Sequence, residues 1–221
     1  MHFSGWDSLV RELYALAQSL PRCGHLSPRH SLPRDGVYLF FERGERVRLD
    51  GQSVDRIVRV GTHKVDGRFR ERIRQHYGRV RTLGGDRSGS VFRKHVGGAL
   101  LRRAHSEVER LAAWLHREDL RFPEVEGEVS RTLRDRFTFV CVRVDGRRER
   151  LRIEGGLIAL LARHPLGGPS DGWLGHCAFA AEIRSSGLWN VQHTSDQPIS
   201  VSAFGRFGRL VRATLAEGWG G

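Results

Sequence analysis

Glu154 is a carboxylate that stands inside an apolar helical pattern. Residues 148–163 carry a broad apolar face formed by Leu151, Ile153, Leu157, Ile158, Leu160 and Leu161. At about 100° per residue, Glu154 falls within that face. A carboxylate in such a place is costly unless it is paired, hydrogen-bonded or bound to a cation. Two interpretations follow: an ion pair with an arginine, or a site for a hard divalent ion, which accepts one or two carboxylates together with water and phosphate oxygens.

A second group of reactive side chains lies in residues 68–77, RFRERIRQHY. Phe69, Ile73 and Tyr77 recur at i, i+4 and i+8, which predicts the buried stripe of a short helix. Arg72 and His76 are four residues apart, so they share a face beside that stripe. From there they can reach a groove, although a solvated arginine on a basic helix is the simpler alternative.

The positive charge of the chain is concentrated around this helix. The 221 residues have a net charge of +12 and a pI near 11.0. Residues 56–103 hold fourteen lysines and arginines but only three acids. This predicts a polyanionic partner, most commonly a nucleic-acid backbone, and strongly salt-dependent binding; a merely soluble basic surface is the alternative. The candidate phosphate-binding residues are Arg59, Lys64, Arg68, Arg87, Arg93 and Lys94.

Several other classes of protein fit the sequence poorly. The three cysteines, Cys23, Cys141 and Cys177, are odd in number and widely spaced, which argues against a disulfide framework and favours a reducing cytoplasm. Their spacing with nearby histidines does not suit a structural zinc site. No apolar run reaches membrane-spanning length. Residues 1–20 carry internal charges and make a poor signal peptide, so we expect a cytoplasmic protein without a membrane partner.

The surrounding elements predict an α/β fold, with a small central β-sheet flanked by helices. We expect two strands that form a hairpin, a third strand after a helical stretch, an N-terminal helix and a C-terminal extension. The predicted strands are 36–42, 55–60 and 137–144; the predicted helices are 5–19, 68–77, 90–104, 106–117, 148–163 and 205–216. The expected organisation is a helix and linker at 1–34, a core with a helical insertion at 35–165, and an extension at 166–221.

The hairpin and the helix after it resemble the core of GIY-YIG nucleases. Gly36-Val37-Tyr38 matches the first signature, and Arg59-Val60-Gly61 matches the second in its last two residues. In that family a tyrosine, an arginine on the next helix and a glutamate on a later helix surround one divalent ion and the scissile phosphate. The resemblance assigns these roles to Tyr38, Arg72 and Glu154, and it places His76 where members carry Tyr or His.

The chain departs from the family pattern at three places. Arg59 replaces the second signature tyrosine, and Thr62 replaces a lysine, so either His63 or Lys64 would assist Tyr38 or Tyr38 would act alone. Leu166 stands where many members have an asparagine, which Asn190 would supply if 164–185 is an insertion.

The resemblance implies an endonuclease that uses Mg²⁺ or Mn²⁺ to hydrolyse DNA phosphodiester bonds, in restriction, phage defence or repair. RNA remains open as a substrate. The alternative is a nucleic-acid-binding module with the same fold that has lost cleavage.

Overall fold

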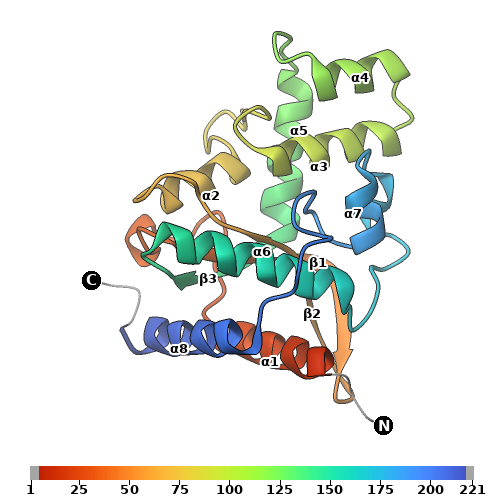
Figure 1. The fold of residues 1–221 in the computed structure, drawn as a ribbon. Coiled ribbons are helices and arrows are strands. Elements are labelled where there is room, and N and C mark those ends of the chain that lie inside the picture. The colour runs from red at the N-terminus through yellow and green to blue at the C-terminus, as the bar shows by residue number, and fades with distance from the viewer. Residues whose placement is uncertain (1–4, 218–221) are drawn as a thin grey trace.

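A three-stranded antiparallel sheet with strand order β2–β1–β3 lies at the centre of the protein (Figure 1). This computed structural model describes residues 5–217. The strands are β1 (Gly36–Leu49), β2 (Gln52–Gly61) and β3 (Phe137–Arg143). β1 runs well beyond the predicted end at residue 42, because Gly44, with a φ of 93°, lies in an irregular stretch of the strand rather than in a chain reversal.

Eight α-helices are present in the described part of the chain, and two short 3₁₀ turns lie at Arg29–Ser31 and Leu174–Cys177. Among residues 5–217, no helix combines the length and the apolar composition that a membrane span requires. The helices are α1 (Gly5–Ser19), α2 (Phe69–Tyr77), α3 (Val91–Arg103), α4 (Val108–His116), α5 (Pro123–Arg136), α6 (Arg147–Arg163), α7 (Ala181–Ser186) and α8 (Val201–Glu217).

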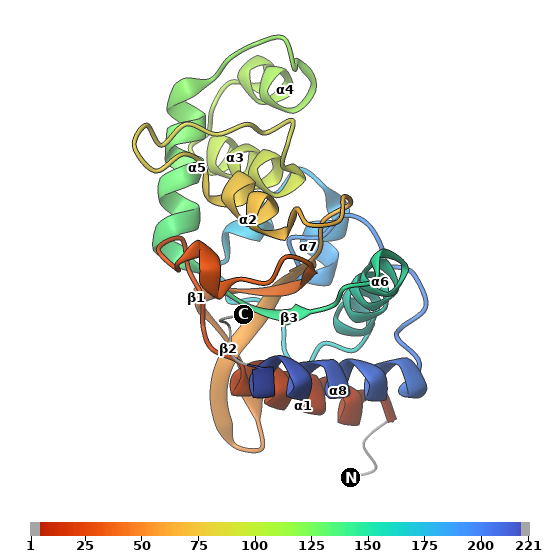
Figure 2. The ribbon, with the colours of Figure 1, turned by 90° about the vertical axis from the view of Figure 1, so that its left-hand side faces the viewer.

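Side chains alternate between the two faces of the sheet, and each face has its own core. Val37, Leu39 and Phe41 of β1 pack with apolar residues of α1, α6 and α8. Tyr38 and Phe40 pack with residues of α2, α3 and α5. Figures 1 and 2 show α1 and α8 side by side below the sheet, with α2, α3 and α5 above it. The predicted α/β fold, with a small sheet flanked by helices and a leading helix, is confirmed.

Helix α5 was missing from the sequence-based prediction. Its signals are a proline at the start, Glu124 and Glu126 in the first turn, and a buried Val125–Val129–Leu133 stripe. A buried ion pair between Arg93 Nη2 and Glu126 Oε2, 2.6 Å apart, joins α5 to α3. Together with α4, these helices form a lobe on one face of the sheet (Figure 2).

Both outer edges of the sheet are occupied by other segments. Beside β2, the Trp189 N–H donates to the Val58 carbonyl at 2.7 Å, and the Asn190 side chain bonds both backbone groups of Val60. Beside β3, Cys23 exchanges two backbone hydrogen bonds with Phe139, at 2.7 and 2.8 Å.

Candidate active site

The two signature strands place Tyr38 directly opposite Gly61. The two residues are cross-strand partners, and the ring of Tyr38 lies across the Gly61 backbone. A Cβ at residue 61 would overlap that ring, so only glycine fits beside the buried tyrosine. This explains physically why a Val-Gly pair belongs at the end of β2.

His76 holds the Tyr38 hydroxyl. Its Nε2 lies 2.8 Å from the phenol oxygen, and its Nδ1 lies 2.8 Å from Ser90 Oγ at the start of α3. His76 is fully buried, and this burial, followed by the charges of Arg72, Arg59 and Arg93, holds its pKa well below the usual value. The imidazole is therefore neutral near pH 7, with one nitrogen donating and the other accepting. It can fix the direction of the tyrosine hydroxyl without carrying a charge.

Arg59 lies between Tyr38 and Glu154. Its guanidinium donates to the Trp189 carbonyl and lies over the Phe92 ring, 4.8 Å from the centroid. Burial lowers its pKa, while the nearby Tyr38 and Glu154 act in the opposite direction. Its Nε is buried without a hydrogen-bond partner in the described structure. The residue that replaces the second signature tyrosine is thus a cation at the centre of the site.

Arg72 reaches the same site from α2. Its Nη1 donates to the Gly89 carbonyl at 2.8 Å and to Gln75 Oε1 at 3.2 Å, and the side chain remains partly exposed. Its charge lies close enough to lower the pKa values of both His76 and Glu154. A partly exposed guanidinium near the half-buried Glu154 carboxylate can bind a phosphate oxygen.

Glu154 enters from α6. One carboxylate oxygen, Oε1, accepts the Thr62 N–H at 3.0 Å, while the Thr62 hydroxyl donates to the Gly36 carbonyl at 2.6 Å. Burial raises the pKa of Glu154, against smaller opposing effects of Arg59 and the Thr62 hydrogen bond. Among the described residues, Glu154 has no ion pair, so the arginine partner considered as an alternative is not found there.

The surroundings of Glu154 fit a single divalent cation. Oε2 has no hydrogen-bond partner among residues 5–217, which leaves it available to a ligand. No cluster of three or more His, Cys, Asp or Glu side chains occurs in that range. One carboxylate with water and substrate oxygens is a normal arrangement for Mg²⁺, which rarely uses an all-protein cage.

His63 and Asn190 support the signature strands from within. His63 is buried; its Nε2 accepts the Gly36 N–H at 3.2 Å, and its Nδ1 donates to the Val65 carbonyl at 2.7 Å. Asn190 accepts from the Val60 N–H at 3.1 Å and donates to its carbonyl at 2.9 Å. Both nitrogens of the histidine and both ends of the amide are therefore engaged with backbone.

The arginines and lysines expected at the nucleic-acid surface divide into two groups. Lys64 and Arg68 are exposed, and Lys94 is half-buried. Arg87 and Arg93 lie inside the protein instead: Arg87 donates to the carbonyls of Trp114 and Arg117, and Arg93 pairs with Glu126. The sequence could not distinguish the two groups, because it does not show which arginines lie inside the helical lobe, where carbonyl and carboxylate oxygens engage them.

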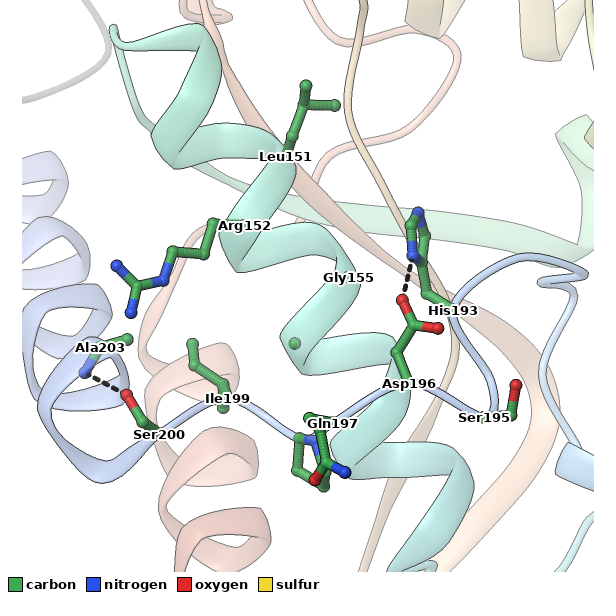
Figure 3. Close-up of a pocket in the computed structure, with 12 residues that line it drawn as sticks. Leu151, Arg152, Gly155, His193, Ser195, Asp196, Gln197, Ile199, Ser200 and Ala203 are labelled. Carbon is green, nitrogen blue, oxygen red and sulfur yellow. Dashed lines mark hydrogen bonds and ion pairs between the residues drawn. The ribbon is translucent and has the colours of Figure 1, made fainter.

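A histidine–aspartate pair beside Glu154 was not singled out by the sequence. His193 Nδ1 lies 2.7 Å from Asp196 Oδ2, and the ring packs against Gly155, the residue after Glu154 (Figure 3). The charge of His193 acts on Glu154 and lowers its pKa. His193 has a φ of 67°, a left-handed conformation that is uncommon outside glycine. The sequence feature that could have indicated this pair is the segment His193-Thr194-Ser195-Asp196, in the loop before the last helix.

The fold agrees with the comparison with known families. The chain matches the family described as GIY-YIG domain over residues 5–216, and it belongs to that family. Members of this family are generally endonucleases that depend on a divalent metal and act on nucleic acids. No curated protein and no solved structure matches the chain.

Proposed function

We propose that the protein is a metal-dependent endonuclease that hydrolyses DNA phosphodiester bonds. The observation that carries the proposal is the position of Arg59, whose guanidinium is close to both the Tyr38 phenol and the Glu154 carboxylate. A base, a cation and a metal-binding carboxylate therefore share one site. Restriction, phage defence or repair would be the setting, and RNA is the other possible substrate.

In the proposed reaction, Tyr38 takes or relays the proton of a water molecule whose oxygen attacks phosphorus: the phenolate takes the proton itself, whereas the phenol passes its own proton to His76 Nε2 as it takes that of the water. His76 holds the phenol in position through its 2.8 Å hydrogen bond. Arg72 binds a non-bridging phosphate oxygen and stabilises the charge that develops there. A divalent cation on Glu154 would stabilise the leaving oxygen, which departs with the electrons of the broken P–O bond and later takes a proton.

Arg59 and His63 have supporting roles in this scheme. Arg59 lies close enough to Tyr38 for the two to interact electrostatically, and it takes the place of the second tyrosine of the family. His63 holds the Gly36 backbone, because both of its ring nitrogens are engaged. We assign it to positioning, with proton transfer left to Tyr38.

The second candidate is a nucleic-acid-binding module without cleavage, and the observation that favours it is the same Arg59. If a second tyrosine is essential for catalysis, a buried arginine cannot replace it.

Incubation with supercoiled plasmid and Mg²⁺, with EDTA as the control, distinguishes the two functions. The endonuclease should convert plasmid to nicked or linear forms in Mg²⁺ only. The Glu154→Gln variant should be inactive, whereas Glu128→Gln, which changes an exposed glutamate of α5, should cut like the parent. Plasmid that is bound and retarded by the parent but stays supercoiled in Mg²⁺ and in Mn²⁺ would favour the binding module.

A further inference from the structure

A groove lined by arginines runs between α6 and the start of α8, away from the helices that carry most of the positive charge in the sequence. It is a hollow of about 810 Å³, with walls formed by both helices. Its basic side chains are Arg148 and Arg152 on α6, and Arg206 and Arg209 on α8. The spacing of four and three residues puts each pair on one face of its helix. All four arginines are exposed.

The positive charge of this groove is mostly unneutralised. Glu149 is the one acidic residue among those that line it, and Arg206 forms an ion pair with it. Arg148, Arg152 and Arg209 have no ion-pair partner among residues 5–217. Other exposed arginines do have partners, such as Arg117 with Asp119 at 2.7 Å. Three unpaired cations in one concave surface raise its affinity for anions.

The groove adjoins a second hollow that reaches the residue next to Glu154. Arg152 and Ala203 line both this groove and a second hollow of about 610 Å³, which ends at Gly155 and His193 beside Glu154. Figure 3 shows Arg152 extending from α6 towards Ala203 at the start of α8. From Gly146 to Gly155, α6 rises about 14 Å at 1.5 Å per residue. That length corresponds to about four base-pair steps along the axis of a duplex, at 3.4 Å each.

We propose that the α6–α8 groove holds the phosphates of the nucleic-acid strand on one side of the scissile bond. The proposal rests on the proposed function, because it takes Glu154 as the place where the bond is cut. A nucleic-acid strand fits better than a single anion, since the arginines follow one another along the groove. It fits better than a flat anionic surface, since the charge lines a hollow and adjoins a second hollow at Gly155 and His193, next to Glu154.

The test compares two double variants that remove equal charge. Arg152→Ala/Arg209→Ala takes one cation from each wall of the groove, and Arg43→Ala/Arg48→Ala removes two exposed arginines of β1. Binding of a fluorescent 20-base-pair duplex is measured by anisotropy in EDTA over a series of KCl concentrations. EDTA prevents metal-dependent cleavage, so the assay reports binding alone.

We expect the groove variant to lose about 10-fold or more in affinity at 0.1 M salt. The slope of log K against log salt should become less negative by about two units, one for each phosphate contact. The β1 variant should keep the slope of the parent. Arg152→Lys/Arg209→Lys, which retains the charge, should also keep it, and this result excludes a folding defect as the cause.

Equal losses in the groove and β1 variants, or no loss in either, would overturn the groove proposal. Failure of the proposed function would give a different result. The groove variant would bind the duplex more weakly than the parent and the β1 variant, as expected, but the parent would leave plasmid intact in Mg²⁺. A parent that does not bind nucleic acid at any salt concentration would overturn both.

Discussion

Tyr38 is held from three directions, and each contact constrains its hydroxyl. Gly61 leaves space for the ring, His76 accepts or donates a hydrogen bond at 2.8 Å, and Arg59 approaches the oxygen with its guanidinium. The resemblance led us to expect that His76 would hydrogen-bond either a phosphate oxygen or Tyr38, and the structure shows a hydrogen bond to Tyr38. Their direct hydrogen bond depends on how α2 packs against β1, which residue spacing alone does not specify.

Tyr38→Phe should abolish cleavage while DNA binding stays near that of the parent. The substitution removes only the phenol oxygen, and a general base is worth on the order of 10²–10⁴-fold in rate. The measurement is single-turnover cleavage of a plasmid in Mg²⁺, with anisotropy for binding.

A Tyr38→Phe protein that cuts at the parent's rate would show that another group takes the proton. His193, which pairs with Asp196 beside Glu154, would then be the next candidate to substitute.

Glu154→Gln should eliminate cleavage and leave the protein as stable or more stable in EDTA. The amide oxygen can still accept the Thr62 N–H, and the buried charge is removed. Because burial raises the pKa of Glu154, the parent loses stability as pH rises from the unfolded value of about 4.5 through that raised pKa. The increase in stability caused by Glu154→Gln should therefore be absent at low pH and complete at neutral pH.

Thermal melts of both proteins, in EDTA and in Mg²⁺, provide the measurement for Glu154. Mg²⁺ should raise the melting temperature of the parent alone. A variant that melts much lower in EDTA would mean that Glu154 is half of a structural ion pair, since breaking such a pair costs about 3–5 kcal/mol.

At the level of elements, the sequence predicted the strands and most helices because their apolar periodicity was strong. Helix α6 and the β1–β2 hairpin are examples. Helix α5 was missed because Gly127 and seven charged residues obscure its apolar pattern, and the buried ion pair between Arg93 of α3 and Glu126 of α5 is not visible in the sequence. The division of the chain at residues 34 and 165 stays a prediction.

Arg93 is the residue whose role changes most between sequence and structure. It is fully buried and donates to Glu126, to Ser130 Oγ and, through Nη1, to the His76 carbonyl at 2.9 Å. The same side chain therefore connects α3, α5 and the C-terminal end of α2. The contact to His76 links the helical lobe to the hydrogen bond on Tyr38.

Glu126→Gln should destabilise the protein by about 3–5 kcal/mol, because it leaves the Arg93 charge buried and uncompensated. Urea unfolding measures the loss, and Asp119→Asn, which breaks an exposed pair, serves as the control with a much smaller effect. An equal, small effect of both substitutions would contradict a structural role for the buried pair.

Over the whole molecule, charge in the sequence overstates charge on the surface. Four of the fourteen basic residues in 56–103 are buried: Arg56, Arg59, Arg87 and Arg93. The α6–α8 groove lies outside that segment and keeps its arginines exposed. The net charge of a segment cannot separate buried arginines from exposed ones, because burial and ion pairing depend on residues far away in the chain.

Acid should destabilise the protein as pH falls below about 6.5. Burial lowers the pKa of His76 well below normal, that of His95 to about 4, and that of His63 as well. The unfolded chain then binds more protons than the folded one, so stability is full above the unfolded value and is lost as pH falls towards the lowered values. Each fully shifted histidine contributes about 1.4 kcal/mol per pH unit in that window.

Urea unfolding at pH 7.5 and 5.0 checks this expectation. The raised pKa values of Glu42 and Glu154 make the protein more stable at low pH and so oppose the effect of the histidines. Comparison of the parent with His95→Gln therefore measures the contribution of one histidine. The variant should lose less stability on acidification than the parent. Equal losses in both proteins would mean that His95 takes up no proton on unfolding.

The segments that occupy the two sheet edges also affect how copies of the protein can meet. An open edge strand offers unpaired N–H and C=O groups to any extended chain, and this is a common start of strand exchange and aggregation. Here the side-chain amide of Asn190 hydrogen-bonds the Val60 N–H and carbonyl as a neighbouring strand would, and the backbone of Cys23 does the same at Phe139. Two copies therefore cannot join their sheets at these positions without first displacing Asn190 or Cys23.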